Sequence, residues 1–328
     1  MFRWGILSSA KIAREQLIPA IAASQNGVVA AIASRDVVRA EEVARQYAIP
    51  LALGSYDELL SRDDIDGIYI PLPTAQHVEW TLKAIEAGKH VLCEKPIALN
   101  AGDLEPLIAA RDAAGVTVAE AFMVQHHPQW AKTRALIASG AIGTLRHVQG
   151  AFSYHNVDPS NMRNRPELGG GALPDIGVYP TVVTRLVTGA EPLEAAARVV
   201  RDPAFGTDIY ADCRLRFADF DCSFYVATQM AARQSMVFHG SDGFIEIETP
   251  FNVGSYGHPV LRLEDQAHGR AEVFRFGKTD QYRLQVEAFV RRARGEDAPI
   301  FTLENSVANQ RVIDALYRAG KSGGWESV

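Results

Sequence analysis

A carboxylate and an amine follow directly on a short apolar run. Residues 91–93 have the composition of a buried parallel strand, and Glu94, Lys95 and Pro96 come next. A lysine at the carboxyl end of such a strand faces the crevice in which open α/β sheets bind ligands, so its ammonium can donate a hydrogen bond to a substrate hydroxyl. The alternative is a lysine whose side chain extends from the strand end into solvent.

A second carboxylate and a phenol are expected on one helical face. The apolar residues Ile176, Val183 and Val187 recur near helical spacing and predict a helix over this segment. Asp175 and Tyr179, at positions i and i+4, then project from the same face. Such a pair can exchange a proton with a reacting hydroxyl. The alternative is a core helix whose tyrosine only packs.

The composition indicates an ordinary globular chain of two domains. It has 328 residues, 47% hydrophobic and 22% charged. The net charge of −6 is spread along the sequence, so neither nucleic acid nor a membrane is expected as a partner. Three cysteines stand at spacings that suit neither a metal site nor a disulfide framework. No signal peptide or membrane span is recognisable, which predicts a cytoplasmic protein.

Two patterns of secondary structure divide the chain. Over residues 1–120, short apolar strands alternate with amphipathic helices, which predicts βαβ units and a parallel sheet with helices on both faces. Over residues 121–328, longer alternating runs joined by turn residues predict hairpins of an antiparallel sheet. No flexible linker separates the two regions, so closely packed domains are expected, with the site where they meet.

The first strand-to-helix turn occupies the position of a dinucleotide-binding loop. Such loops use glycines so that the backbone can approach a pyrophosphate at a helix N-terminus. The expected glycines fall at Ser8, Ala10 and Ala13, which are small residues but not glycine. The alternative is an ordinary turn with a serine as the helix N-cap. A dinucleotide loop would contact its cofactor through Ser8, Ser9, Ala10, Lys11 and Ile12.

The end of the second strand indicates which dinucleotide is bound. Ser34 and Arg35 stand roughly twenty residues after the first turn, where a carboxylate would bind the ribose of NAD. A hydroxyl and a guanidinium favour a 2′-phosphate instead, because arginine offers phosphate a planar fork of donors. We therefore predict NADP, with NAD less favoured. Arg39 would either add a second positive charge or be a surface arginine. Asp36 would either contact the ribose of NAD or begin the following helix in solvent.

Three motifs together resemble the Gfo/Idh/MocA family of oxidoreductases. They are CEKP at residues 93–96, PLPTAQH at 71–77 and GGGALPDIGVYP at 169–180, and the match covers essentially the whole chain. The Ser-Arg pair, the tyrosine of DIGVYP and the run AEAFMVQHHPQ are similar to the branch of dimeric dihydrodiol dehydrogenase and NADP-dependent aldose 1-dehydrogenases. The resemblance implies an α/β protein, with an N-terminal Rossmann domain and a C-terminal α/β domain built on a large, open, mainly antiparallel sheet.

Hydride transfer defines what the catalytic residues must do. When an alcohol gives its hydride to a nicotinamide, its hydroxyl proton must leave as well, and Tyr179 is the expected acceptor. A free phenol has a pKa of about 10, so it needs the positive charge of Lys95 to ionise near neutral pH. Asp175 then orients the lysine or a substrate hydroxyl. The alternative makes Lys95 the acid and base, and Tyr179 only a binding group.

The resemblance also implies binding residues. The segment 71–77 is expected along the edge of the cofactor, and Glu94 at the nicotinamide ribose. The alternatives are a solvent-facing His77, a Glu94 that pairs structurally, and a solvated Arg163. The implied cofactor contacts are Pro71, Leu72, Pro73, His77, Glu94 and Lys95, and the implied substrate contacts are Asn161, Arg163, Asp175 and Tyr179.

The predicted function is an NADP-dependent dehydrogenase acting on CH–OH groups of a small polyhydroxylated substrate, a sugar or related polyol. A second possibility oxidises a trans-dihydrodiol or reduces a dicarbonyl. A third, from another class, is a non-enzymatic NADP-binding regulatory protein, and the presence of both Lys95 and Tyr179 argues against it. Because the family usually covers its open sheet with the sheet of another subunit, a homo-oligomer, most simply a dimer, is expected.

Overall fold

The computed structural model describes residues 1–328, which form two compact units. The first unit comprises Met1–His126 and Asp280–Val307, and the second comprises His127–Thr279 and Ala308–Val328. No helix combines the length and the apolar character needed to cross a lipid bilayer.

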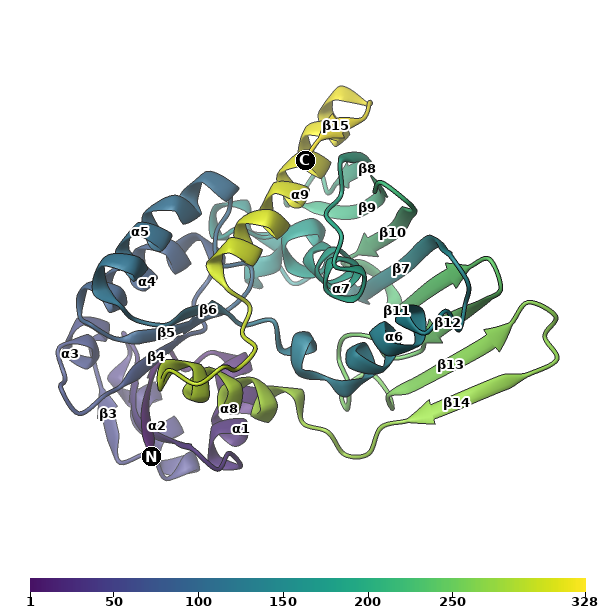
Figure 1. Ribbon diagram of the computed structural model, residues 1–328. Coiled ribbons are helices and arrows are strands. Elements are labelled where there is room, and N and C mark those ends of the chain that lie inside the picture. Colours follow the sequence, from purple (N-terminus) through teal and green to yellow (C-terminus); the bar gives the residue numbers. More distant parts are fainter. The chain divides into compact units, whose positions relative to one another are not determined.

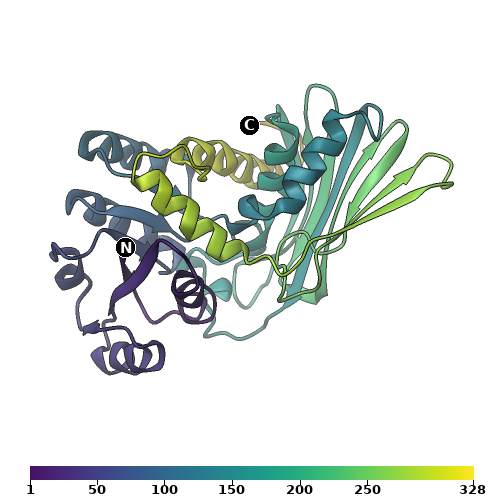
Figure 2. The same ribbon diagram turned by 60° about the horizontal axis from the view of Figure 1, so that its bottom comes forward.

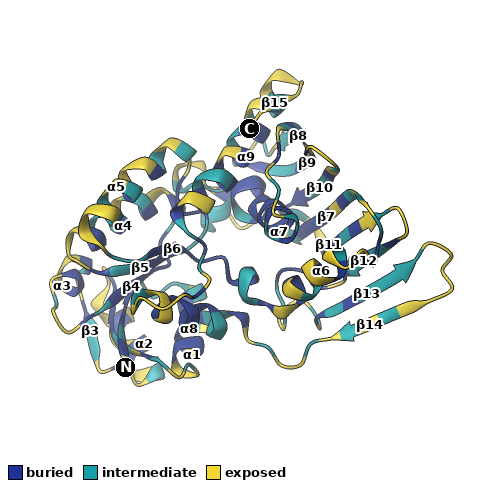
Figure 3. Ribbon diagram, in the orientation of Figure 1, coloured by how far each residue is buried: buried dark blue, intermediate teal, exposed yellow.

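The first unit is built on a parallel sheet of six strands in the order β3-β2-β1-β4-β5-β6 (Figure 1). The strand order reverses between β1 and β4, and in open α/β sheets such a reversal opens a ligand-binding crevice at the carboxyl ends. Figure 3 shows β1, β4 and β5 buried along most of their length. The strands are β1 (Phe2–Leu7), β2 (Gly27–Ala33), β3 (Leu51–Leu53), β4 (Gly67–Ile70), β5 (His90–Cys93) and β6 (Val118–Glu120).

Helices cover both faces of this sheet, as a buried parallel sheet requires. One apolar cluster packs α3, α4 and α5 on one face, and a second packs α1, α2 and α8 on the other. The doubly wound fold predicted from the alternating pattern is therefore confirmed. The helices are α1 (Ile18–Ala22), α2 (Val37–Tyr47), α3 (Tyr56–Leu60), α4 (His77–Glu86), α5 (Glu105–Ala114) and α8 (Gln281–Ala293).

The first unit includes a segment far beyond the domain boundary predicted at residue 120, namely Asp280–Val307. Helix α8 lies far along the chain, yet its residues Val286, Phe289 and Val290 are fully buried in the core of the first unit. The ring of Phe289 packs 5.1 Å from that of Trp4 on β1. The apolar face of α8 finds its partner on the first sheet, and this pairing is invisible in the local sequence pattern.

The second unit is built on a nine-stranded sheet in the order β14-β13-β12-β11-β7-β10-β9-β8-β15. Only the β7–β10 pair is parallel, so the prediction of a mainly antiparallel open sheet is confirmed. The hairpins expected at FADFDC and HGSDG connect β9 to β10 and β11 to β12. The strands are β7 (Leu145–His155), β8 (Glu194–Arg201), β9 (Asp208–Arg216), β10 (Asp221–Ala227), β11 (Gln229–Gly240), β12 (Gly243–Ile247), β13 (Val260–Asp265), β14 (Ala271–Arg275) and β15 (Glu326–Ser327).

Helices lie against one face of this sheet. Figures 1 and 2 show α6 (Pro128–Ala138) and α7 (Val178–Thr188) on the same side of it, with α7 packed on β7. A π-helical turn, η7 (Leu173–Gly177), runs directly into α7. Helix α9 (Leu303–Ser322) completes the helical elements. Burial alternates along β9, where Ala211, Cys213 and Leu215 are buried and the residues between them are exposed, as expected for a sheet covered on one face.

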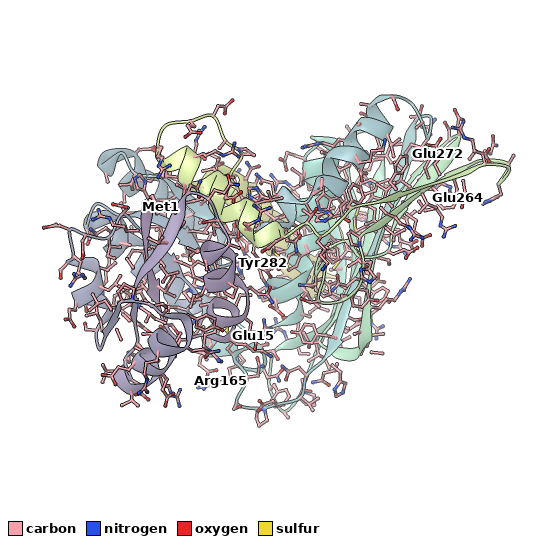
Figure 4. The ribbon with its side chains drawn as sticks, turned by 90° about the horizontal axis from the view of Figure 1, so that it is seen from below. Met1, Glu15, Arg165, Glu264, Glu272 and Tyr282 are labelled. Atoms are coloured by element: carbon pink, nitrogen blue, oxygen red, sulfur yellow. The ribbon has the colours of Figure 1, made fainter.

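The outer hairpin of the nine-stranded sheet has a charged edge. Glu264 on β13 and Glu272 on β14 lie on neighbouring strands (Figure 4). Glu264 is paired with Arg262 at 3.6 Å, and Glu272 is paired with Arg270. Charged side chains on an edge strand disfavour pairing with a further strand, which protects this hairpin from aggregation.

Candidate active site

The Lys95 segment leaves the sheet at the carboxyl end of β5, as predicted. The first residue after the strand, Glu94, donates its amide to the Ile70 carbonyl at 3.0 Å. Its carboxylate accepts a hydrogen bond from the Tyr69 hydroxyl at 2.6 Å and from the Lys95 amide at 3.3 Å. Burial and the adjacent Glu94 carboxylate raise the pKa of Tyr69 well above its usual value, so the phenol remains a donor. Glu94 thus pairs with Tyr69 and with the Lys95 amide, and its contact with the nicotinamide ribose stays a prediction.

The first strand-to-helix turn has the geometry of a dinucleotide loop without its glycines. Ser8, the residue after β1, has φ 106°, a conformation that side chains rarely adopt and that the first glycine of the usual fingerprint provides freely. Its amide donates to the Ala33 carbonyl at the end of β2. The expected contact residues from Ser8 to Ile12 are partly or fully exposed. The amides at a helix start lack helical partners, so this turn fits a pyrophosphate.

The end of β2 presents a free guanidinium beside a buried hydroxyl. Ser34 is 7% exposed, and its hydroxyl accepts the Asp36 amide at 3.2 Å. Arg35 is exposed and makes no hydrogen bond or ion pair. Asp36 is the N-cap of α2 and pairs with Arg39 at 3.3 Å, so it begins the helix as expected. The unpaired Arg35 suits a phosphate group on the ribose.

The PLPTAQH segment connects β4 to α4. Pro71 and Leu72 are buried, and Pro73 precedes a short 3-10 turn. His77, the first residue of α4, is 1% exposed, so the solvent-facing alternative is wrong. Its ring nitrogens lie 2.7 Å from the carbonyl oxygens of Leu72 and Pro96. Both nitrogens thus face the protein backbone, and any part of His77 in cofactor binding acts through the loops that it holds.

In the second unit, Asp175 lies in a cluster of polar side chains. Its Oδ2 accepts hydrogen bonds from the Tyr154 hydroxyl at 2.7 Å and from Arg163 Nε at 2.8 Å. The Asp175 side chain is 13% exposed and that of Arg163 is 42% exposed. The carboxylate raises the pKa of Arg163, and burial together with Asp175 raises the pKa of Tyr154. At neutral pH the cluster therefore holds an ion pair and a protonated phenol, and the solvated alternative for Arg163 is wrong.

Tyr179 lies on α7, one turn after Asp175. The prediction of a helix with buried Ile176, Val183 and Val187 is confirmed, although its first turn is π-helical. Tyr179 is 4% exposed, and its ring packs 5.5 Å from those of both Phe152 and Phe251. These aromatic contacts fix the direction of the phenol.

Asn161 has a local role. Its side chain accepts the Arg163 amide at 3.1 Å and caps the short turn that carries the arginine. It therefore orders the loop beside Asp175, and a substrate contact from it stays a prediction.

Three polar residues near these segments were not predicted. Tyr154 projects from β7 onto Asp175, Asp208 on β9 accepts the Leu173 amide at the start of η7, and Glu120 lies at the end of β6. Glu120 had a signal, because it follows an apolar strand as Lys95 does. Tyr154 and Asp208 lie on strands in which successive side chains point to opposite faces of the sheet. The sequence does not show which of these faces a given helix covers, so neither residue gave a signal.

Comparisons with known proteins agree with this architecture. Residues 2–122 match the family described as "Oxidoreductase family, NAD-binding Rossmann fold". Residues 130–246 match the "GFO/IDH/MocA C-terminal domain". The chain belongs to the Gfo/Idh/MocA oxidoreductase family. It is therefore an NAD(P)-binding oxidoreductase, and the family predicted from the three motifs is confirmed.

Individual relatives cover almost the whole chain. An uncharacterized oxidoreductase of Rhizobium meliloti is 41% identical over 100% of this chain and 99% of its own. A D-xylose 1-dehydrogenase (NADP(+)) of Haloferax volcanii is 35% identical over 98% of both chains. The solved structure of a 3-ketoreductase from Actinomadura kijaniata with NADP and TDP-benzene has a TM-score of 0.91 at 30% identity, covering 97% of both chains.

Proposed function

We propose that this protein is an NADP-dependent dehydrogenase that transfers a hydride between NADP and a hydroxyl-bearing carbon of a sugar or related polyol. The observation that carries the proposal is the Tyr154–Asp175–Arg163 cluster, whose carboxylate lies in η7, the turn that runs directly into the helix bearing Tyr179. A carboxylate held by a phenol and a guanidinium offers both acceptors and donors. That combination recognises a carbon chain with several hydroxyl groups.

The residues of this chain handle the proton that accompanies the hydride. NADP, when bound, supplies or accepts the hydride. Tyr179 takes the hydroxyl proton during oxidation and returns it during carbonyl reduction, and Lys95 stabilises the phenolate and holds the reacting oxygen. Asp175, fixed by Tyr154 and Arg163, orients a second hydroxyl of the substrate. In the alternative assignment, Lys95 transfers the proton and Tyr179 only binds.

The preference for NADP rests on Arg35. Its guanidinium is exposed and unpaired next to the buried Ser34 hydroxyl, at the strand end where the ribose of a dinucleotide binds. The xylose dehydrogenase relative is named for NADP, and the ketoreductase relative was crystallised with it. The name of the xylose dehydrogenase also refers to a sugar, which supports a sugar-like substrate over a dicarbonyl or a cyclic diol.

The test is the absorbance of reduced nicotinamide when the purified protein is incubated with NADP or NAD and a panel of aldoses, inositols and cyclic diols. We expect turnover of a sugar with NADP, and its loss in Lys95→Met and Tyr179→Phe. Lys83→Met, which removes a surface lysine paired with Glu79, and Tyr256→Phe, which alters a tyrosine that is 40% exposed, are the controls.

The outcome separates the candidate functions. Turnover of a diol alone would transfer the proposal to a dihydrodiol dehydrogenase. Tight NADP binding without turnover of any substrate would instead favour the regulatory class.

We also propose that the uncovered face of the nine-stranded sheet binds a second copy of the chain. Residues on this face mix aromatic and charged groups, with Tyr210 stacked 6.3 Å from Tyr225 and Asp212 and Arg214 exposed. Such a mixture is typical of protein interfaces. Sedimentation at micromolar concentration is expected to give a dimer, and a monomer would contradict the proposal.

A further inference from the structure

The Pro96–Ile97 peptide group, one residue beyond Lys95, lies between two buried side chains. The carbonyl oxygen of Pro96 lies 2.7 Å from His77 Nδ1, and the amide of Ile97 donates to Glu120 Oε1 at 2.9 Å. These two atoms belong to the same peptide plane. His77 is 1% exposed and Glu120 is 4% exposed, so no water competes for either bond.

The two side chains are anchored independently of the turn that they hold. Glu120 ends β6, where its amide donates to Phe301 and it pairs in register with Cys93 of β5. His77 begins α4, and its second nitrogen lies 2.7 Å from the Leu72 carbonyl. The turn is therefore attached to two separately buried segments of the first unit, the start of α4 and the end of β6.

The pKa values of Glu120 and His77 are both shifted by their burial beside the turn. Burial raises the pKa of Glu120 to about 7, against the opposing influence of Ser306, the Ile97 amide and the positive Lys95. Burial lowers the pKa of His77 to about 4, and the charge of Lys95 acts in the same direction. Near neutral pH the imidazole is neutral and donates to one carbonyl at a time. Burying a carboxyl group costs folding free energy unless the group is hydrogen-bonded, and both Glu120 and His77 lie within electrostatic reach of Lys95.

We propose that Glu120 and His77 are positioning residues that fix the Pro96–Ile97 peptide and thereby the direction in which Lys95 leaves the sheet. The inference rests on the proposed function, in which Lys95 holds the reacting oxygen. Because a misplacement of about 1 Å can cost about a hundredfold in rate, a turn that is free to rotate would reduce catalysis without removing any group that touches the substrate.

The experiment compares Glu120→Ala, Glu120→Gln and Glu120→Asp with the unmodified enzyme and with Lys95→Met. We measure kcat and KM by the absorbance of reduced nicotinamide, and the dissociation constant of the reduced form of NADP by its nicotinamide fluorescence. Glu120→Ala removes the acceptor of the Ile97 amide, and kcat is expected to fall by about 10- to 100-fold, with NADP affinity within about twofold. Glu120→Gln keeps a carbonyl oxygen at that place and is expected to restore most of kcat.

Two further variants separate positioning from stability. Val290→Ala opens a cavity in the α8 core, without a polar contact to the turn, and is expected to lower the melting temperature while kcat is retained. His77→Phe removes the imidazole donor that lies between the Leu72 and Pro96 carbonyls, so it should weaken NADP binding as well as kcat. If Glu120→Ala does not fold, Glu120→Asp keeps the charge but withdraws it from Ile97, and a fall in kcat is expected there too.

The failure of this inference and that of the proposed function are distinguishable. If Lys95→Met is inactive while every folded Glu120 variant keeps kcat within twofold of the unmodified enzyme, the positioning role is refuted. If Glu120→Gln is as impaired as Glu120→Ala, the hydrogen bond to Ile97 is not the relevant feature, and the inference fails. If Lys95→Met itself retains full kcat, the proposed function fails instead.

Discussion

Asp208 secures the start of the helical segment that bears Asp175 and Tyr179. Its carboxylate accepts hydrogen bonds from the Leu173 amide and the Tyr317 hydroxyl, both at 2.7 Å. Asp208 is 1% exposed, and the Leu173 amide is the first donor of η7. A helix start leaves its first amides without partners, so a buried start needs such an acceptor. We therefore predict that Asp208 is a major determinant of stability in the second unit.

The size of the effect follows from the two bonds. Asp208→Ala leaves the buried Leu173 amide without an acceptor, which costs about 1–3 kcal/mol, and removes the bond from the half-buried Tyr317, worth about 0.5–1.5 kcal/mol. The free energy of unfolding should fall by about 2–4 kcal/mol. Asp208→Asn keeps one acceptor oxygen and should lose only about 1 kcal/mol. Tyr317→Phe removes the weaker bond alone.

The assay is urea unfolding of the three variants and of the double variant Asp208→Ala/Tyr317→Phe. Because Tyr317→Phe removes a bond that is already absent in Asp208→Ala, the double variant should be about as stable as Asp208→Ala alone. A loss below about 0.5 kcal/mol in Asp208→Ala, or full additivity of the two changes, would refute the reasoning.

The same carboxyl group gives a pH dependence. Burial raises the pKa of Asp208 in the folded chain, so the folded state holds its proton more tightly than the unfolded state does. The tighter binding of the proton stabilises the folded state at a pH below the unfolded pKa of about 3.9. This stabilisation is lost as the pH rises through the pKa of Asp208 in the folded chain. Asp208→Asn does not titrate. The difference in free energy of unfolding between the unmodified protein and Asp208→Asn should therefore become smaller as the pH increases above about 4.

Three further outcomes are expected. Arg35→Asp should raise the dissociation constant of NADP by about 10- to 100-fold, and change that of NAD less, because charge-assisted hydrogen bonds contribute about 1.5–3 kcal/mol; equal changes for both dinucleotides in a fluorescence titration would contradict the 2′-phosphate contact. Ser8→Gly should stabilise the protein by about 1 kcal/mol in thermal unfolding, since φ is 106° at that position; an unchanged melting temperature would show that the serine is unstrained. Arg111 lowers the pKa of Glu304 to about 2, so this ion pair stabilises the fold above the unfolded pKa of about 4.3 and is lost as the pH falls towards 2. The Glu304 side chain is 57% exposed, so Glu304→Gln should remove no more than about 1 kcal/mol of that acid-dependent stability. An unfolding free energy that falls with pH in the same way as that of the unmodified protein would argue against the pair.

Residues that act through their own strand or helix were predictable. Lys95 follows an apolar run, and such a run between turn signals predicts a strand whose end lies at the ligand side of a parallel sheet. Asp175 and Tyr179 are four positions apart, and the helical segment predicted for them forms as η7 followed by α7. The N-cap at Asp36 likewise depends only on residues within one turn of helix α2.

Contacts between distant segments were not predictable in this way. A polar residue at a helix start commonly faces solvent, yet the His77 ring lies between two backbone carbonyls that belong to different loops. The pairing of Asp175 with Tyr154 joins residues 21 positions apart, and a strand of alternating residues does not reveal which face meets a given helix. The apolar face of helix α8 could pack on either of the two sheets, and the local sequence does not show that it packs on the first.

The sequence by itself determined the two kinds of sheet, the strand end that carries Lys95, the helix that carries Tyr179 and the family of the chain, because hydrophobic periodicity and short motifs are local properties. Only the tertiary structure decided that α8 belongs to the first unit, that Arg163 and Tyr154 hold Asp175, and that Glu120 and His77 hold the peptide after Lys95. The physical reason is that a buried polar group must find a partner, and which partner lies within reach depends on how segments far apart in the chain pack together.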